Sequence, residues 1–223
     1  MEHGKPIVLP FCYIPTIHPA IFYDDGNGTA NYVLAGSGSD YTVAYSTQAA
    51  FCRTKGLRLA TKTTTPAVDD YVQATKNFWY PASQRLRIQL LFCDTDTTVD
   101  KEITFSLTTT DGTTLKAMLV QCGVAQNYVA IYVPVATAFQ LPGAQWIRFN
   151  LGWNYLDLSA DLSSMYYKTL ALNHQVFDIS QHQVHTAAIG TEPRACFTIL
   201  LTTKEAAISI IYVSDILITP DLR

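Results

Sequence analysis

Charged side chains are scarce in this 223-residue chain, where they make up 15% of the residues, against about 25% in an average protein. The net charge is −3, and no run of Lys and Arg occurs. The electrostatic footprint of a nucleic-acid-binding protein is therefore missing, and we expect no nucleic-acid partner. Since 48% of the residues are apolar, the low charge favours extensive burial, in a core or also at an interface.

Long hydrophobic runs are also missing. No window approaches the ~20 uninterrupted apolar residues of a membrane helix, so we expect no membrane partner. The apolar segment from Ile7 to Ile14 is interrupted by Pro10 and makes a poor signal peptide. No signal peptide is therefore evident, and a cytoplasmic or virion-associated location is favoured.

The cysteines form neither a CxxC pair nor an even disulfide framework. They are scattered widely, at Cys12, Cys52, Cys93, Cys122 and Cys196. The last three lie in or beside apolar segments, where a free thiol behaves as a small hydrophobe. This distribution favours a reducing compartment.

Helical periodicity is absent as well, apart from one possible turn near residues 67 to 74. Apolar and polar residues instead alternate with the period of two that is typical of half-buried strands. We predict about a dozen strands, of which the clearest cover residues 31 to 35, 85 to 92, 114 to 120, 127 to 133, 145 to 151, 166 to 172, 175 to 179, 195 to 202 and 211 to 219. Tight turns are expected at Asp111-Gly112 and Asn173-His174. Short strands at regular spacing predict an all-β chain, a two-sheet antiparallel β-sandwich of the jelly-roll type.

The first twenty residues differ from the rest because they carry four prolines, at Pro6, Pro10, Pro15 and Pro19. Proline at this density blocks a central strand or a helix and favours an extended arm. We therefore divide the chain into an arm over residues 1 to 20 and a single β-sandwich domain over residues 21 to 223. The apolar arm packs either along its own domain or on a neighbouring subunit, which would make a homo-oligomer.

Three segments carry a resemblance to a known superfamily. They are the strand Trp146-Ile147-Arg148-Phe149-Asn150-Leu151, the hairpin from Tyr166 to Ile179 with Asn173-His174 in its turn, and the closing strand from Ile211 to Ile218 with Asp215. Together they resemble the concanavalin A-like lectin/glucanase jelly roll, including its laminin-G-like relatives. The resemblance implies a concanavalin A-like sandwich, and the alternatives are a viral-type jelly roll or another sandwich.

Glutamate is too rare for the catalytic pattern that the glucanases of that superfamily use. Those enzymes place paired carboxylates on one strand, one as nucleophile and one as acid/base. The four glutamates are Glu2, Glu102, Glu192 and Glu205, and none belongs to a Glu-x-Asp-x-Glu motif. No catalytic residue is carried over, and the chain is expected not to be an enzyme, although carboxylates from distant strands could still meet in the fold.

An acidic cluster offers a candidate calcium site. Asp94, Asp96 and Asp100 supply hard oxygen ligands at spacings that a Ca²⁺ loop could use. The alternative is a solvated loop between two strands. No other cofactor is indicated.

Aromatic residues provide the candidate ligand site. Trp79 and Tyr80 lie in the loop-like segment Asn77-Phe78-Trp79-Tyr80-Pro81, and Trp153 and Tyr155 follow Gly152. Sugars stack apolar ring faces on such side chains, whereas the alternative is packing at the edge of the core. The sequence thus predicts a non-enzymatic, lectin-like protein that binds a saccharide or a similar extended ligand. A structural or assembly protein, such as a phage- or virus-like component whose arm makes oligomer contacts, is the second hypothesis.

Overall fold

A computed structural model describes residues 20–24, 26, 31–51, 55–140, 147, 149–150, 152–190 and 192–221. Almost all of the predicted N-terminal arm lies outside these residues, as do Cys12, Cys52 and most of the strand predicted over residues 145 to 151. The arm, the oligomer it would build and the assembly role therefore stay predictions.

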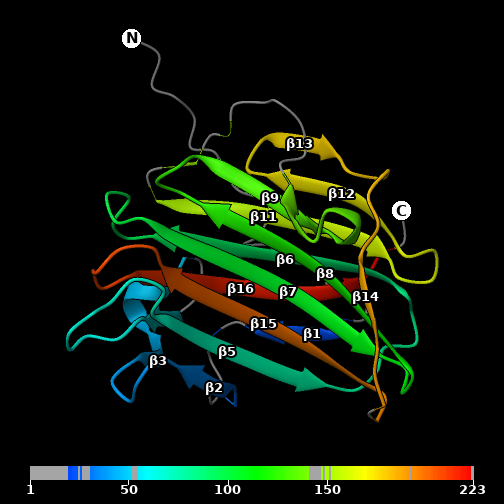
Figure 1. Cartoon of the computed structure of the whole chain (residues 1–223), viewed down its shortest axis with the longest axis horizontal. Helices are drawn as coiled ribbons and strands as arrows, with labels where there is room; N and C mark the ends of the chain where they lie inside the picture. The colour runs from blue at the N-terminus through cyan, green and yellow to red at the C-terminus, as the bar shows by residue number, and fades with distance from the viewer. Residues whose placement is uncertain are drawn as a thin grey trace.

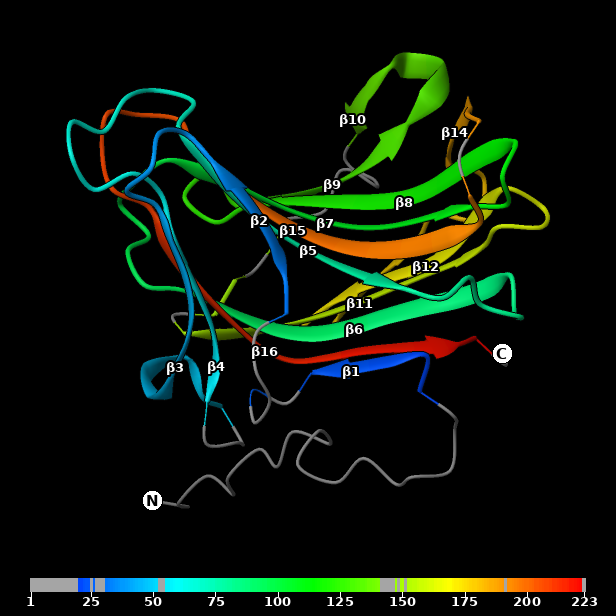
Figure 2. The same cartoon turned by 90° about the horizontal axis from the view of Figure 1, so that it is seen from below.

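Two antiparallel sheets of eight strands stack face to face (Figures 1 and 2). The first sheet has the order β13-β12-β11-β6-β16-β4-β3, and β1 also pairs with β16. Its strands are β1 (Phe22–Asp24), β3 (Thr42–Ser46), β4 (Gly56–Ala60), β6 (Arg85–Asp94), β11 (Trp153–Asp161), β12 (Tyr166–Leu172), β13 (Gln175–Asp178) and β16 (Ile210–Pro220).

The second sheet has the order β10-β9-β8-β7-β15-β5-β2, and β14 also pairs with β8. Its strands are β2 (Val33–Gly36), β5 (Tyr71–Phe78), β7 (Lys101–Thr110), β8 (Thr114–Gly123), β9 (Tyr128–Val133), β10 (Ala138–Gln140), β14 (His185–Ala188) and β15 (Arg194–Thr203). The described residues contain no α-helix; two short 3₁₀ turns, η2 (Thr47–Ala49) and η3 (Pro134–Ala136), complete the fold. The prediction of an all-β, two-sheet antiparallel sandwich is confirmed.

The hairpin between β7 and β8 shows how the sequence fixes one turn. Asp111 accepts hydrogen bonds from the backbone N–H groups of Thr113 (3.0 Å) and Thr114 (2.8 Å). Gly112 has φ = 101°, a conformation that side chains disfavour. Asp-Gly was predicted as this turn, and the ladder that follows pairs Thr110 with Leu115.

One hydrophobic core lies between the sheets because every second residue of the long strands points inward. Its first-sheet side includes Leu86, Ile88, Leu90 and Phe92 of β6, and its second-sheet side includes Ile103, Phe105 and Leu107 of β7, all fully buried. The rings of Phe92 and Phe105 meet across the two layers, 5.5 Å apart.

Tyr167 of β12 connects the layers by hydrogen bonds. Its hydroxyl accepts from the Leu119 N–H (3.0 Å) and reaches the carbonyl oxygens of Leu119 and Tyr132, at 3.2 and 3.3 Å. These strands, β8 and β9, belong to the opposite sheet.

Two sequence expectations need correction. The possible helical turn near residues 67 to 74 is present only as a short turn over residues 67 to 70, where the Asp70 N–H donates to the Ala67 carbonyl oxygen at 3.2 Å. Residues 71 to 78 form strand β5, which pairs with β15 and β2. No strand was predicted directly after Gly152, but Trp153 begins the nine-residue strand β11 between β6 and β12. The number of strands is sixteen in the described residues, above the expected dozen. No helix among the described residues is long and apolar enough to cross a membrane.

Candidate functional site

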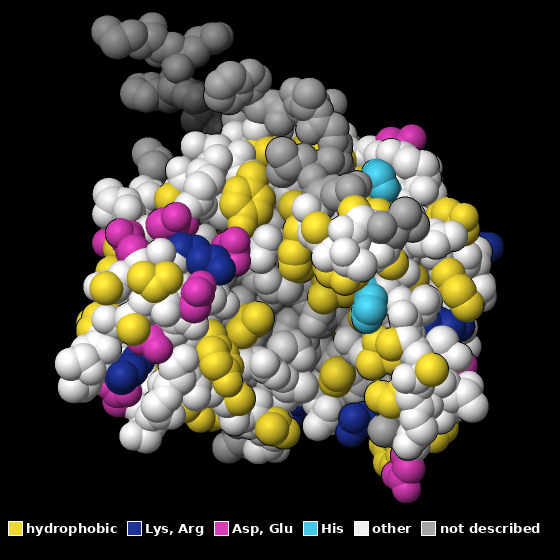
Figure 3. All heavy atoms as spheres, in the orientation of Figure 1, with side chains coloured by type: hydrophobic (Ala, Val, Ile, Leu, Met, Phe, Trp, Pro, Cys, Tyr) yellow, Lys and Arg dark blue, Asp and Glu magenta, His cyan; other side chains and the backbone are white. Residues whose placement is uncertain are grey.

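The outer face of the second sheet is a trough. Figure 2 shows loops at one side, and β10 and β14 at the other, rising above the plane of this sheet, and Figure 3 shows the hollow between them. Alternate residues of the central strands line its floor because their neighbours point into the core. These residues are Gln73, Thr75 and Asn77 of β5, Cys196, Thr198 and Leu200 of β15, Thr104, Ser106 and Thr108 of β7, and Ala117, Leu119 and Gln121 of β8.

Most floor side chains carry a hydroxyl or an amide and no charge. They are arranged in cross-strand rows, such as the row in which Thr198 lies between Thr75 and Ser106. The Thr75 and Thr198 hydroxyls are 3.0 Å apart, and the Gln73 amide donates to Thr75 at 2.9 Å. A floor of short polar groups can both donate hydrogen bonds to a polyhydroxylated ligand and accept them.

One wall of the trough is aromatic. The Tyr132 ring of β9 meets Phe139 of β10 edge to face at 5.6 Å, and His185 of β14 at 5.2 Å. These contacts join the two short strands that stand beside the floor. Sequence reasoning missed this wall because its three residues come from three separate segments.

At one end of the trough lies a pocket of about 450 Å³ that we call the Trp79 pocket. It is lined by Asn77, Phe78, Trp79, Glu192, Pro193 and Arg194. Trp79 follows β5 directly and is 91% exposed, which is unusual for the largest apolar side chain. Tyr80, which is partly buried, is not among the lining residues.

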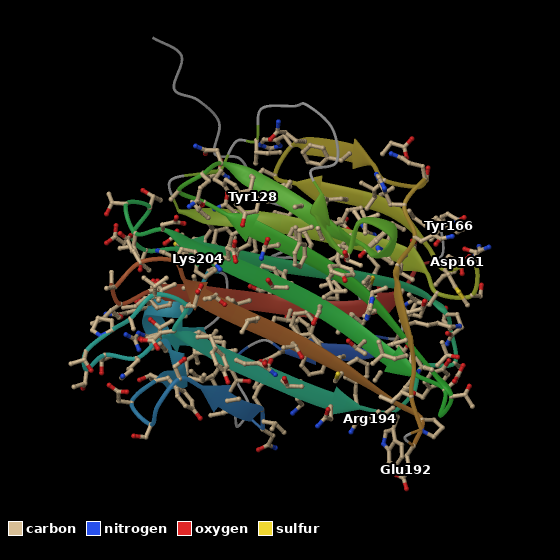
Figure 4. The ribbon with its side chains drawn as sticks, viewed as in Figure 1. Tyr128, Asp161, Tyr166, Glu192, Arg194 and Lys204 are labelled. Carbon is tan, nitrogen blue, oxygen red and sulfur yellow. The ribbon has the colours of Figure 1, made fainter. Side chains whose placement is uncertain are left out.

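Two opposite charges accompany Trp79 in this pocket. Figure 4 shows Glu192 and Arg194 where the chain enters β15. Both side chains are exposed, and no ion pair or side-chain hydrogen bond joins either to another described residue. Their proximity to Trp79 results from the pairing of β15 with the end of β5, in which Ala195 lies opposite Phe78. No local motif could have indicated it.

The opposite end of the trough carries a paired charge cluster. Lys204, which follows β15, contacts Asp69 at 3.1 Å and Glu102 at 2.9 Å. Tyr128 of β9 donates to Glu102 at 3.1 Å (Figure 4). Burial acts to lower the pKa of Lys204, but the hydrogen bonds to Glu102 and Asp69 raise it overall. The carboxylates of Asp69 and Glu102, which come from separate segments, thus lie near each other, and both contact the ammonium group of Lys204.

Known proteins resemble this chain in structure alone. No family model and no curated protein matches its sequence. The structure is similar to arcelin-5, a lectin-like defence protein from Phaseolus vulgaris, with a TM-score of 0.53 and 11% identity over 91% of this chain and 98% of that one. It is also similar to lectin I-B4 from Griffonia simplicifolia, with a TM-score of 0.53 and 10% identity over 90% of this chain and 100% of the lectin. A mixed-linkage glucan GH16 protein from Bacteroides ovatus gives a TM-score of 0.50 at 12% identity, over 88% and 99% of the two chains.

The fold is the concanavalin A-like jelly roll. The superfamily resemblance stated from the sequence is confirmed for the fold alone. Sequence identities of 10 to 12% to these proteins show nothing beyond the fold.

The predicted calcium loop of this jelly roll encloses an ammonium group. Lys101 is fully buried, and its Nζ donates to Asp94 Oδ1 and to the Asp96 carbonyl oxygen, both at 2.5 Å. Burial raises the pKa of Asp94, although Lys101 acts in the opposite direction. Asp96 accepts from Thr98, and the Asp100 carboxylate accepts from Gln126.

Lys101 thus supplies a positive charge where the cation would sit. Among the described residues, no group of three or more His, Cys, Asp or Glu side chains is arranged to hold a metal ion. Calcium binding by Asp94, Asp96 and Asp100 stays a prediction. A rise in the unfolding temperature on adding excess calcium would support it.

The four predicted aromatic contacts divide between the two sheets of the jelly roll. Trp79 and Tyr80 follow β5 of the second sheet, whereas Trp153 and Tyr155 lie on β11 of the first. The Trp153 ring packs edge to face on Phe51 at 5.6 Å.

The Tyr155 hydroxyl is already engaged in hydrogen bonds. It accepts from Gln89 at 2.8 Å and donates to Asp157 at 2.9 Å, and Asp157 also binds the Arg87 guanidinium. Burial, followed by the charge of Asp157, raises the pKa of Tyr155. A ligand role for Trp153 and Tyr155 stays a prediction, and it would require a second surface, separate from the trough.

Proposed function

We propose that this protein binds carbohydrate in the trough of its second sheet and does not cleave it. The observation that carries the proposal is the exposed indole of Trp79 at the end of a floor lined by hydroxyl and amide groups. Aromatic faces stack on the C–H faces of sugar rings, and a few convergent polar groups fix their orientation. Lectins among the proteins of similar structure add support by analogy.

The dimensions of the trough suit an extended ligand. Strands in a sheet are about 4.8 Å apart, so the floor strands β5, β15, β7 and β8 span roughly 14 Å across the sheet. Along β15, Arg194 and Lys204 are ten positions apart, which corresponds to about 33 Å at 3.3 Å per residue. A ligand of several sugar units is therefore expected, in preference to a single monosaccharide.

The charge cluster supports binding without hydrolysis. A retaining or inverting glycosidase needs one carboxyl group as a proton donor and a second as nucleophile or base. Glu102 and Asp69 instead both contact the ammonium of Lys204. Both carboxylates at this end of the trough are therefore engaged in ion pairs.

The test is a glycan array with the full chain, followed by calorimetric titration of the best ligand. Trp79→Ala should weaken binding by about 30-fold, since truncating a central aromatic contact costs on the order of 2 kcal/mol. The variant should unfold at the wild-type temperature because the side chain is exposed.

Trp153→Ala is the matched control, because it removes an indole from the other sheet. It should leave affinity unchanged. Loss of binding in Trp153→Ala with full binding in Trp79→Ala would move the site to the outer face of the first sheet. An array on which the folded protein binds no glycan would refute carbohydrate binding itself.

A further inference from the structure

Unlike Arg85 and Arg87, Arg194 has no acidic partner among the residues that the structure describes. Arg85 pairs with Asp161 at 3.2 Å, and Arg87 pairs with Asp157. Arg194 lines the Trp79 pocket, and no ion pair or side-chain hydrogen bond joins it to another described residue. The N–H groups of its planar guanidinium are therefore available to an anion from outside the chain.

We propose that the Trp79 pocket selects an acidic sugar, one whose ring stacks on Trp79 while its carboxylate binds Arg194. This inference rests on the proposed carbohydrate binding and adds the chemical class of the ligand. A guanidinium matches a carboxylate with two parallel hydrogen bonds, which a hydroxyl group cannot reproduce. Uronic acids present the required combination of one carboxylate, several hydroxyls and an apolar ring face.

The other lining groups suit the rest of such a sugar. Asn77 both donates and accepts hydrogen bonds, and the carboxylate of Glu192 accepts from hydroxyls. Because Glu192 repels a second carboxylate, it also favours the orientation in which the acid group of the sugar faces Arg194. The volume of about 450 Å³ falls within the range of about 300 to 1,000 Å³ that small-molecule sites occupy.

The charge of Arg194 also reaches the floor of the trough. Burial raises the pKa of the Cys196 thiol, and the guanidinium of Arg194 acts in the opposite direction. Cys196 lies two residues further along β15 and opposite Asn77. The positive charge of Arg194 is thus close enough to the floor of the trough to act on Cys196.

The experiment uses acidic oligosaccharides, each paired with its carboxyl-reduced counterpart of the same length and linkage. Calorimetric titration of the full chain should show the acidic member binding at least about tenfold more tightly, a difference that shrinks as salt is added. Arg194→Gln should remove this preference, so that the acidic member and its reduced counterpart bind the variant with equal affinity. Glu192→Gln, which removes a repelling charge, should keep the preference or increase it.

The outcomes separate the two proposals. Equal binding of both members by the wild type, or a preference that persists in Arg194→Gln, would overturn the acidic-sugar inference and leave carbohydrate binding intact. Failure to bind either member or any glycan on the array would refute carbohydrate binding, and this inference with it. Since Arg194 and Glu192 are exposed, both variants should fold, and their unfolding temperatures should equal that of the wild type.

Discussion

Replacing Lys101 with methionine should destabilise the protein strongly. Methionine fills a similar volume but removes the ammonium that donates to Asp94 and to the Asp96 carbonyl. The Lys101 side chain is 0% exposed and that of Asp94 is 2% exposed, and Asp94 Oδ2 has no hydrogen-bond partner within the described residues. Removing one partner of a buried pair costs about 3 to 5 kcal/mol, a large share of the roughly 5 to 15 kcal/mol that keeps a domain folded.

Urea denaturation at neutral pH measures this cost, with Lys204→Met as the matched control. Lys204 also contacts two carboxylates, but its side chain is 32% exposed. Its loss should therefore cost no more than about 1 kcal/mol. A double variant, Lys101→Met with Asp94→Leu, should regain most of the stability, because no uncompensated charge stays buried. A loss below about 1 kcal/mol for Lys101→Met would refute the reasoning.

The penalty should also depend on pH. Burial raises the pKa of Asp94 above its ordinary value in the folded protein, so the folded state binds this proton more readily than the unfolded state. The contribution of Asp94 to the free energy of unfolding therefore falls as pH rises from the ordinary carboxyl pKa to the raised one. Without Lys101 the pKa should rise further, and the penalty measured at mildly acidic pH should be smaller than at neutral pH.

Three further predictions concern the sandwich. Tyr167→Phe, which removes the hydroxyl that bonds to the opposite sheet, should cost about 1 to 3 kcal/mol in urea denaturation. Phe105→Ala should cost about 3 to 5 kcal/mol, because its ring is fully buried against Phe92. Burial acts to raise the pKa of Asp161, but hydrogen bonds, chiefly from Ser163, lower it to about 2. Its contribution is present at neutral pH and is lost as pH falls from about 4 to about 2, so the stability difference between wild type and Asp161→Asn should disappear over that range.

Local pattern was sufficient to predict several strands. The strand predicted over residues 166 to 172 coincides with β12, and those over 195 to 202 and 211 to 219 fall within β15 and β16. These segments combine period-two alternation with clear turns. β11 was missed although Leu156, Leu158 and Ala160 alternate with Asp157, Ser159 and Asp161 along it. β5 was ambiguous because its strand form is stabilised by β15, about 120 residues later in the chain.

The candidate site was only partly predictable for a similar reason. Trp79 was identified from its aromatic neighbours, but its exposure and its position beside Arg194 depend on the register of β5 against β15. A different long-range pairing, that of β11 with β6, places Trp153 and Tyr155 on the other sheet. Lys101 directly follows Asp100 of the predicted acidic loop, and sequence alone does not show that its side chain turns inward.

The positions of β15 and β16 have a consequence for biosynthesis. β15 lies between β7 and β5, and β16 lies between β6 and β4, so the last two strands of this sandwich to be synthesised are interior strands of the two sheets. Until they emerge, β5 and β2 cannot join the strands β7 to β10, and long strand edges stay unpaired. Such edges recruit other chains. The nascent sandwich should therefore depend on chaperone protection until β15 and β16 have emerged, and ribosome-bound chains arrested before β15 should remain sensitive to protease within the sandwich.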